Sequence, residues 1–381
     1  MTNEIITSDT IKYLRFPMTI GIILAHGNLA RLGIMVHGVK YGTNLPDWLI
    51  YTISLFSEVL ASICVPTFFV ISGYLFFYRS DFDGHIYIQK LKKRFRTLMI
   101  PYLLWNLIAL LAVLVKMLPI FSSFFQNIND IEIRFSLIRL FNTFFYGDGT
   151  NGILVYPYLA APSVSPLPIN GPMWYVRDLM VIILLTPLVY WLVKKLKIWY
   201  VIGLGLYLYV IGNRFLPEGS YLSIVLDYLF FFSIGAYLSI NKQNMVTQMR
   251  KLKYVTILFI PAAIFNVLSI TTPYNRYIFF PFIVIGIITF IVVVSYLLEK
   301  NKIHVNETLA NCSFFIFAFH SLILMEIGKI LFIGLHLNDT PLTMLFLYIA
   351  IPTISVCIGL IVYLFLKRFA PKLFSLLNGG R

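Results

Sequence analysis

Long runs of apolar residues, separated by short polar, proline-containing or glycine-containing segments, dominate this chain. The runs are continuous and do not alternate with polar positions, a pattern typical of membrane-spanning helices and not of a β-barrel. Several approach the ~20 residues that a bilayer requires, and others are long enough to tilt. The pattern predicts about ten spans, at approximately residues 15–36, 53–78, 98–120, 172–193, 198–214, 221–240, 254–270, 278–298, 313–335 and 341–366.

Composition supports a membrane protein. Hydrophobic residues form 59% of the 381 residues and charged residues only 12%, whereas soluble domains are about a quarter charged. We therefore predict an all-α polytopic membrane protein, built as a single membrane-embedded domain over residues 1–381. The three cysteines, Cys64, Cys312 and Cys357, lie in or beside apolar runs. They are expected to be buried packing residues, and we predict neither a disulfide framework nor a metal site.

Basic residues fall mainly on alternate connecting segments. With the N-terminus inside, about two thirds of the 30 lysine and arginine residues lie on the inner side of the membrane. This asymmetry satisfies the positive-inside rule and predicts that both termini are cytoplasmic. The net charge of +14 then encodes mainly topology and attraction to anionic lipid, so no nucleic-acid partner is expected. The longest outer segment, 121–171, is predicted to be an extracytoplasmic loop that serves as a connector, a lid or an acceptor-binding loop.

The densest basic run, "YIQKLKKRFRTLMIPYLLWN", precedes the third predicted span on the inner side. It includes Lys93 and Arg96. One interpretation is an anchor on lipid phosphates, and the other is a docking surface for an anionic cofactor. Composition alone favours the anchor.

The first predicted span carries Arg15, ten further residues and then His26. A helix rises 1.5 Å per residue, so these positions lie roughly 16 Å apart and share one face. This predicts Arg15 at the cytosolic interface and His26 near mid-membrane, on a face that lines an internal cavity because polar groups facing lipid are costly. Neutral imidazole can take a proton from an alcohol that attacks an acyl carbonyl, or accept the acyl group itself. A histidine bonded to a neighbouring helix for packing is the alternative.

Two later segments carry further candidates. His320, in "NCSFFIFAFHSLILMEIG", lies several residues inside its predicted span and can line the same cavity. The segment "GPMWYVRDLMVII" places Trp174, Arg177 and Asp178 at the outer end of another span. Trp174 fits an interfacial belt, while Arg177 and Asp178 either form ion pairs or contact an acceptor.

Taken together and in order, four segments resemble the acyltransferase-3 family of bacterial integral-membrane acyltransferases. They are the arginine–histidine pattern, "FFVISGYL" at 68–75, the basic run ending in "IPYLLWN", and "SFFIFAFHSLIL" late in the chain. "GPMWYVRDL" also resembles the start of a middle helix of the family. The resemblance covers nearly the whole chain. Ser72 and Gly73, within the second segment, are expected to allow close helix packing.

The resemblance implies a function. Family members move an acyl group, often acetyl, from cytosolic acyl-coenzyme A to a hydroxyl of a cell-surface or lipid-linked carbohydrate. It also implies that His26 and Arg15 are essential. The phosphates of coenzyme A need cationic partners, for which Arg15, Lys93, Arg96 and Arg79 are candidates. Lys93 stands where many relatives have an arginine, so it keeps the charge but loses the bidentate fork. The candidates for binding the acceptor are Trp174, Arg177, Asp178 and His320.

A polysaccharide or lipid exporter without acyl-transfer chemistry is the alternative, because a polar cavity among many spans also suits transport. Either function predicts a multi-pass protein of the bacterial cytoplasmic membrane, in contact with the lipid bilayer.

Overall fold

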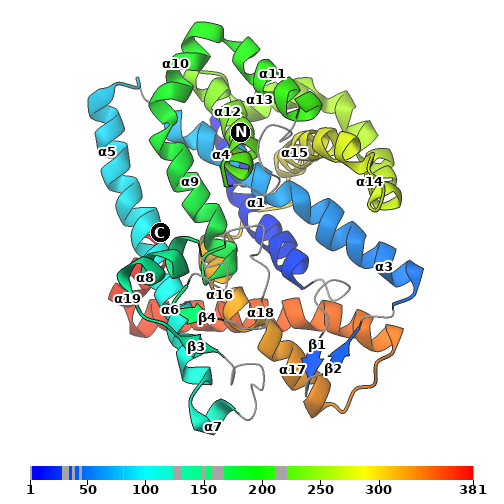
Figure 1. Ribbon diagram of the computed structural model, residues 1–381. Helices are drawn as coiled ribbons and strands as arrows, with labels where there is room; N and C mark the ends of the chain where they lie inside the picture. The colour runs from blue at the N-terminus through cyan, green and yellow to red at the C-terminus, as the bar shows by residue number, and fades with distance from the viewer. Residues whose placement is uncertain are drawn as a thin grey trace.

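Helices dominate the chain, as the apolar pattern predicts. The computed structural model describes residues 2–27, 34–36, 39–42, 45–79, 81–122, 131–146, 152–155, 167–211 and 221–380 (Figure 1). The α-helices are α1 (Asn3–His26), α3 (Asp47–Ser54), α4 (Cys64–Phe77), α5 (Gly84–Arg94), α6 (Ile100–Lys116), α7 (Pro119–Ser122), α8 (Leu137–Phe145), α9 (Trp174–Leu184), α10 (Thr186–Leu196), α11 (Ile198–Leu206), α12 (Tyr221–Ile240), α13 (Met245–Lys251), α14 (Phe259–Ser269), α15 (Asn275–Glu299), α16 (Glu307–Phe319), α17 (Leu324–Gly334), α18 (Pro341–Phe369) and α19 (Pro371–Leu377).

Shorter elements join these helices. The 3₁₀ turns are η2 (Ala61–Ile63), η5 (Gly171–Met173), η7 (Lys253–Leu258) and η8 (His320–Leu322), and the π-helical turns are η1 (Leu55–Leu60), η3 (Phe95–Met99) and η6 (Tyr207–Ile211). Two antiparallel pairs of short strands complete the described secondary structure. They are β1 (Ile34–Val36) with β2 (Val39–Tyr41), and β3 (Glu132–Ile133) with β4 (Leu154–Val155).

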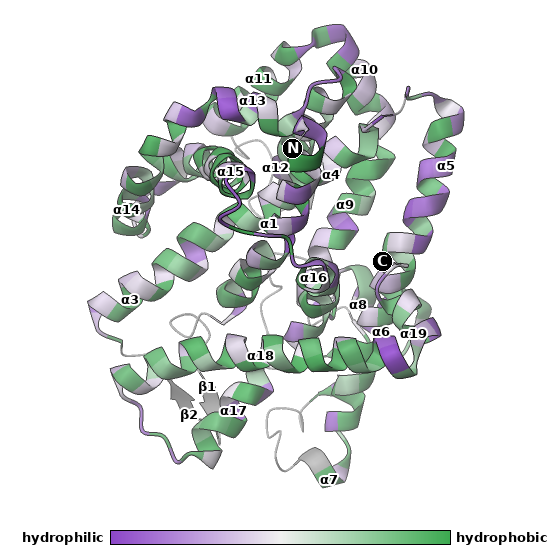
Figure 2. Cartoon of the chain, turned by 180° about the vertical axis from the view of Figure 1, so that it is seen from behind, coloured by the Kyte–Doolittle hydropathy of each residue, from purple (hydrophilic) through white to green (hydrophobic). Residues whose placement is uncertain are grey.

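Several of these helices can cross a membrane. Four described segments are long and apolar enough by themselves: Asp47–Phe77, Gly84–Lys116, Tyr277–Glu299 and Pro341–Phe369. The number rises to seven if each of three bent helix pairs counts as one span. Large apolar side chains such as Ile361 and Phe365 are exposed along α18, and hydrophobic residues cover most of α15 and α18 (Figure 2). The structure therefore supports a polytopic membrane protein, while the predicted ten spans and the cytoplasmic termini stay predictions.

The first helix differs from the predicted span 15–36. It begins at Asn3, where the Thr2 side chain caps it, and ends at His26, where the Gly27 N–H bonds the carbonyl of Ile23 at 2.9 Å. Charged residues in its first half exclude it from the helices that are apolar enough to span by composition. His26 is therefore the last residue of a helix and not the middle of one.

Two glycines bring α4 and α12 into backbone contact. A Cβ placed on Gly73 would overlap the carbonyl of Phe232, and one on Gly235 would overlap the carbonyl of Val70. Such reciprocal small-residue contacts are typical of close helix pairs in membranes. The expected packing role of Gly73 is confirmed, and α4 and α12 form the most extensive helix contact of the fold. Among the cysteines, Cys64 and Cys312 are buried, but Cys357 is exposed, so the expected burial is wrong there.

The glycine contact generates a stability prediction. We expect Gly73→Ala to lower the thermal unfolding midpoint of the purified protein in detergent, because the added methyl must push two helix backbones apart and overpacking costs about 1–3 kcal/mol. The control is Gly203→Ala in α11, where a Cβ would meet no atom within 4 Å. Alanine there is expected to keep or raise the midpoint, since it exceeds glycine in helix propensity. An unchanged midpoint for Gly73→Ala would contradict the packing account.

Candidate active site

Two histidines from opposite ends of the chain lie in contact. His26 ends α1, and His320 begins η8 directly after α16. Because α1 packs against α16, their rings meet with centroids 5.3 Å apart and planes at 44°. The structure thus brings together two residues that sequence analysis singled out separately, while their roles stay predictions.

The bonding of His320 leaves one ring nitrogen unused. Its Nδ1 lies 2.6 Å from the carbonyl oxygen of Phe317, and because a carbonyl only accepts, Nδ1 carries the hydrogen. In the neutral ring Nε2 then holds a lone pair, and it has no hydrogen-bond partner among the described residues. His320 is 0% exposed, and buried polar atoms without partners are rare. An uncommitted acceptor atom therefore lies in the ring that contacts His26.

A cavity of about 320 Å³ reaches His26. Its wall also contains Lys116 from α6, Gly171 from η5, Trp174 from the start of α9, and Ser321 from η8. His26 thus borders open space and is not sealed in helix packing. Trp174, predicted to contact the acceptor, lies in the same wall.

Charged residues flank this cavity. Lys116 Nζ lies 2.5 Å from an oxygen of Glu326, and Lys329 lies 3.8 Å from the other oxygen. All three side chains are about one-fifth exposed, at 22%, 19% and 19%. The cluster joins α6 to α17 and sets a polar edge beside a mainly apolar lining.

A buried asparagine fixes the wall of the cavity. The Asn170 N–H donates to Asn106 Oδ1 at 3.1 Å, and its Nδ2 donates to the carbonyl of Ala318 at 3.0 Å. The hydroxyl of Ser321 donates to Asn170 Oδ1 at 2.7 Å. Asn170 therefore couples α6, the start of α9 and η8 around the histidine pair. Sequence analysis missed it, although it directly precedes the glycine and proline that open the tryptophan segment.

Arg177 and Asp178 have a structural task. Arg177 Nε donates to Asp178 Oδ1 at 2.8 Å, and its Nη1 donates to the carbonyl of Phe145 at 2.7 Å. They are 3% and 0% exposed, and neither lines the His26 cavity. Of the two alternatives from the sequence, the geometry gives the ion pair, and it ties α9 to the end of α8.

Two arginines converge on one tyrosine. Arg15 of α1 and Arg94 of α5 are both half-buried, and each interacts electrostatically with Tyr175 at the start of α9. Glu307, which also attracts Arg15, is bonded by Lys12 at 2.6 Å. No ion pair to either arginine is found among the described residues, so these guanidinium groups can take an anion.

The basic run therefore contributes a residue that sequence analysis did not select. Lys93 and Arg96 are exposed, whereas Arg94 is half-buried and lies near Tyr175. Successive helical residues are rotated by about 100°, so neighbours in a run point to different sides. Arg79 lies elsewhere, exposed and bonded to Glu4, and that bond raises the pKa of Arg79. The predicted donor contacts of these residues stay predictions, and Arg94 joins them as a stronger candidate.

Aromatic rings connect the arginine pair to the histidine pair. The Tyr175 ring lies 6.0 Å from Phe317, and Phe317 lies 6.1 Å from His320. Together with the contact between His320 and His26, these ring contacts form a continuous row of side chains from Tyr175 to His26, which lines the cavity. Within the described residues, no cluster of histidine, cysteine, aspartate and glutamate is arranged to hold a metal ion.

Comparison with known protein families identifies the family to which this chain belongs. The family model described as "Acyltransferase domain", of the acyltransferase-3 type, matches residues 9–363, which is most of the chain. The chain belongs to the acyltransferase-3 family. The match includes the helices that carry both arginines and both histidines. With its apolar helices, this acyltransferase-3 protein has the features of a multi-pass membrane protein.

The chain is also similar to a protein named for succinoglycan biosynthesis. The chain is 32% identical over 240 residues to "Succinoglycan biosynthesis protein ExoH" of Rhizobium meliloti (strain 1021), covering 62% of this chain and 55% of that protein. The chain thus matches about half of the relative's length. No solved structure matches the acyltransferase-3 protein significantly.

The Asn170 network generates a second stability prediction. Asn170→Ala removes two side-chain hydrogen bonds and leaves the Ala318 carbonyl and the Ser321 hydroxyl without these partners. Each such buried group costs about 1–3 kcal/mol, so we expect a clearly lower thermal unfolding midpoint in detergent. Ser321→Ala removes only one of the bonds and is expected to fall between Asn170→Ala and wild type. Equal midpoints for all three proteins would show that the network does not support the cavity wall.

Proposed function

We propose that this acyltransferase-3 protein transfers an acyl group, with acetyl as the expected group, from acyl-coenzyme A to a hydroxyl of a cell-surface or lipid-linked carbohydrate. Family membership supports acyl transfer, and the relative named for succinoglycan biosynthesis supports a carbohydrate acceptor. The observation that carries the proposal is the position of His26. It lies in a cavity wall, in contact with His320 and on the same helix as a cation suited to the donor.

The spacing of Arg15 and His26 matches the donor. Eleven helical residues span roughly 16 Å. Coenzyme A has about fourteen bonds between its thioester carbon and its first phosphorus, and a chain that extends 3.3–3.6 Å per three bonds reaches about 16 Å. A diphosphate held by Arg15 and Arg94 therefore brings the thioester to His26. Guanidinium groups bind phosphate through paired charge-assisted hydrogen bonds.

The reaction needs one base that later acts as an acid. His26 takes the proton from the acceptor hydroxyl while the hydroxyl oxygen attacks the thioester carbonyl carbon. The carbon–sulfur bond then breaks, the acyl group remains on the acceptor oxygen, and the coenzyme A thiolate takes the proton from His26. A neutral imidazole is regenerated, so no further reactant is required.

His320 acts through His26 in this account. Because Nδ1 of His320 is fixed as a donor to Phe317, its Nε2 can only accept a hydrogen. A hydrogen bond from the His26 ring to that atom would select the His26 tautomer whose other nitrogen faces the cavity. This is the orienting task that a second group performs for a catalytic histidine in other enzymes.

The cavity beside His26 suits a sugar. Trp174 offers an aromatic face, while Ser321 and Lys116 offer polar groups. Ligand sites typically combine such apolar surface with a few polar groups that fix orientation. We place the donor entrance at the cytoplasmic face of a bacterial inner membrane and the acceptor entrance at the opposite face. No observation among the described residues specifically favours transport without acyl transfer.

The proposed function predicts a loss of acylation. Cells that produce His26→Ala are expected to lose the acyl substituent from their surface glycans, because the substitution removes the proposed general base. The measurement is mass spectrometry of glycans from matched strains. His304→Ala, which changes an exposed histidine, is the control and should preserve acylation. Normal acylation by a stably produced His26→Ala protein would contradict the mechanism.

A further prediction separates the residues of the basic run. Arg94→Gln is expected to raise the KM for acyl-coenzyme A about tenfold or more, since a hydrogen bond between charged groups contributes about 1.5–3 kcal/mol. Lys92→Gln removes an exposed cation two residues away and is expected to change the KM little. A similar KM for the two variants would mean that general surface charge, and not Arg94, binds the donor.

A further inference from the structure

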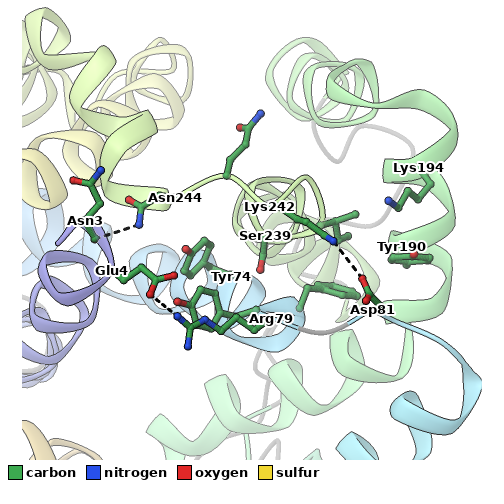
Figure 3. A pocket seen from close by; sticks show the side chains of 14 residues that line it. Asn3, Glu4, Tyr74, Arg79, Asp81, Tyr190, Lys194, Ser239, Lys242 and Asn244 are labelled. Carbon is green, nitrogen blue, oxygen red and sulfur yellow. Dashed lines mark hydrogen bonds and ion pairs between the residues drawn. The ribbon is translucent and has the colours of Figure 1, made fainter.

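A second cavity lies at the other end of α1 from His26. It has a volume of about 520 Å³. Its walls come from the start of α1, the end of α4, the end of α10 and the turn between α12 and α13 (Figure 3). The mechanism above does not use it, although one of its residues, Arg79, is a predicted donor contact.

Basic residues occupy costly backbone positions in this cavity. Arg79, after α4, has φ 52°, and Lys242, after α12, has φ 56°. Residues other than glycine rarely adopt this left-handed region, and such strain concentrates at functional sites. Glycine would fit both positions at lower cost, so the side chains themselves are the reason to place cations there.

The ion pairs in the cavity are weak enough to yield to a stronger anion. Arg79 bonds Glu4, and Lys242 lies 3.6 Å from Asp81 with side chains 84% and 94% exposed. Exposed pairs of this kind contribute little to stability. Lys194, the third cation of the wall, has no ion-pair partner among the described residues and lies over the Tyr190 ring at 5.7 Å. The cations exceed the carboxylates in the lining, which favours an anionic ligand.

A buried hydroxyl points to the same conclusion. Ser239 is 7% exposed, yet its Oγ has no hydrogen-bond partner among the described residues. Figure 3 shows it in the cavity near Tyr74 and Lys242. A hydroxyl without a partner, tyrosine rings and several cations together suit a phosphorylated nucleoside, whose base stacks on rings and whose phosphate binds cations.

Helix geometry connects this cavity to the donor site. Glu4, Arg15 and His26 follow one another at intervals of eleven residues, so they lie within about 40° of one face of α1. Glu4 lies in the wall of this cavity, and His26 in the wall of the other. About 16 Å separate Glu4 from Arg15 along the helix. An adenosine 3′-phosphate joined to the diphosphate by about eight bonds extends about 9 Å, and the long side chains of Arg15 and of the cavity cations span the rest.

We propose that this cavity binds the 3′-phosphorylated adenosine end of the acyl-coenzyme A donor, with Lys194 and Lys242 on the 3′-phosphate and Tyr190 beside the base. The diphosphate then lies at Arg15 and Arg94, and the thioester lies at His26. This inference rests on the proposed function, because it assigns the far end of the same donor.

Binding of two donors to the purified full-length protein in nanodiscs tests the inference. The probes are acetyl-coenzyme A and 3′-dephospho-acetyl-coenzyme A, measured by calorimetry at one salt concentration. The wild type is expected to bind acetyl-coenzyme A about tenfold more tightly, because only this donor offers the 3′-phosphate to the cations. Lys194→Gln is expected to remove most of that preference.

The matched control is Lys195→Gln on the same helix. Lys195 lies over Trp191 and outside the cavity, so the tenfold preference should persist. Lys242→Gly is a second variant that protects the test against misfolding, since glycine relieves the positive φ. It should weaken acetyl-coenzyme A binding several-fold without lowering the unfolding midpoint.

The outcomes separate the two claims. If the wild type binds both donors equally well, or Lys194→Gln keeps the full preference, the cavity does not bind the 3′-phosphate of the donor. The inference is then wrong while the proposed function survives. If the wild type binds neither donor, the proposed function itself fails, and this inference with it.

Discussion

The burial of one polar face of α1 is the constraint on which the rest of this structure depends. A helix among apolar helices can carry Arg15 and His26 only if that face borders protein cavities, because charged and titratable groups in contact with lipid cost several kcal/mol. The packing of α1 against α4, α15 and α16 supplies such surroundings. The close approach of α4 and α12 at Gly73 compacts the wall on one side. The packing that keeps these polar groups away from lipid therefore also places them beside cavities in which a ligand can bind.

In this acyltransferase-3 protein, charged and uncharged polar groups lie at different positions along α1. Cations gather toward its beginning and middle, where the proposed anionic donor binds, and the histidine pair lies at its end. The two regions are joined by the rings of Tyr175 and Phe317. In the proposed function, this separation lets phosphate binding and acyl transfer use different surroundings. The charged end stays polar, while the reacting end combines apolar walls with few polar groups, where electrostatic interactions are stronger.

Sequence reasoning reached the elements whose signal is local. Hydrophobic run length predicts the long helices, and the eleven-residue interval places Arg15 and His26 on one face. Sequence reasoning failed where the position or role of a residue depends on tertiary contacts. The end of α1 at His26 was missed because apolar residues continue beyond Gly27, so hydropathy alone extends the span. Arg94 was missed because only packing shows which of several adjacent cations turns inward. Nor does the sequence indicate that Arg177 bonds the distant carbonyl of Phe145 in α8.

The central claim is that acyl transfer takes place at His26, with the donor extended along α1. A cryo-electron microscopy structure of the full chain with a non-hydrolysable acetyl-coenzyme A analogue tests it most directly. The account predicts the carbonyl carbon of the analogue beside the His26 ring, with room for an acceptor oxygen within about 3–3.5 Å of that carbon. It also predicts the diphosphate at Arg15 and Arg94. An analogue bound with its acyl end away from His26, or its diphosphate away from both arginines, would contradict it.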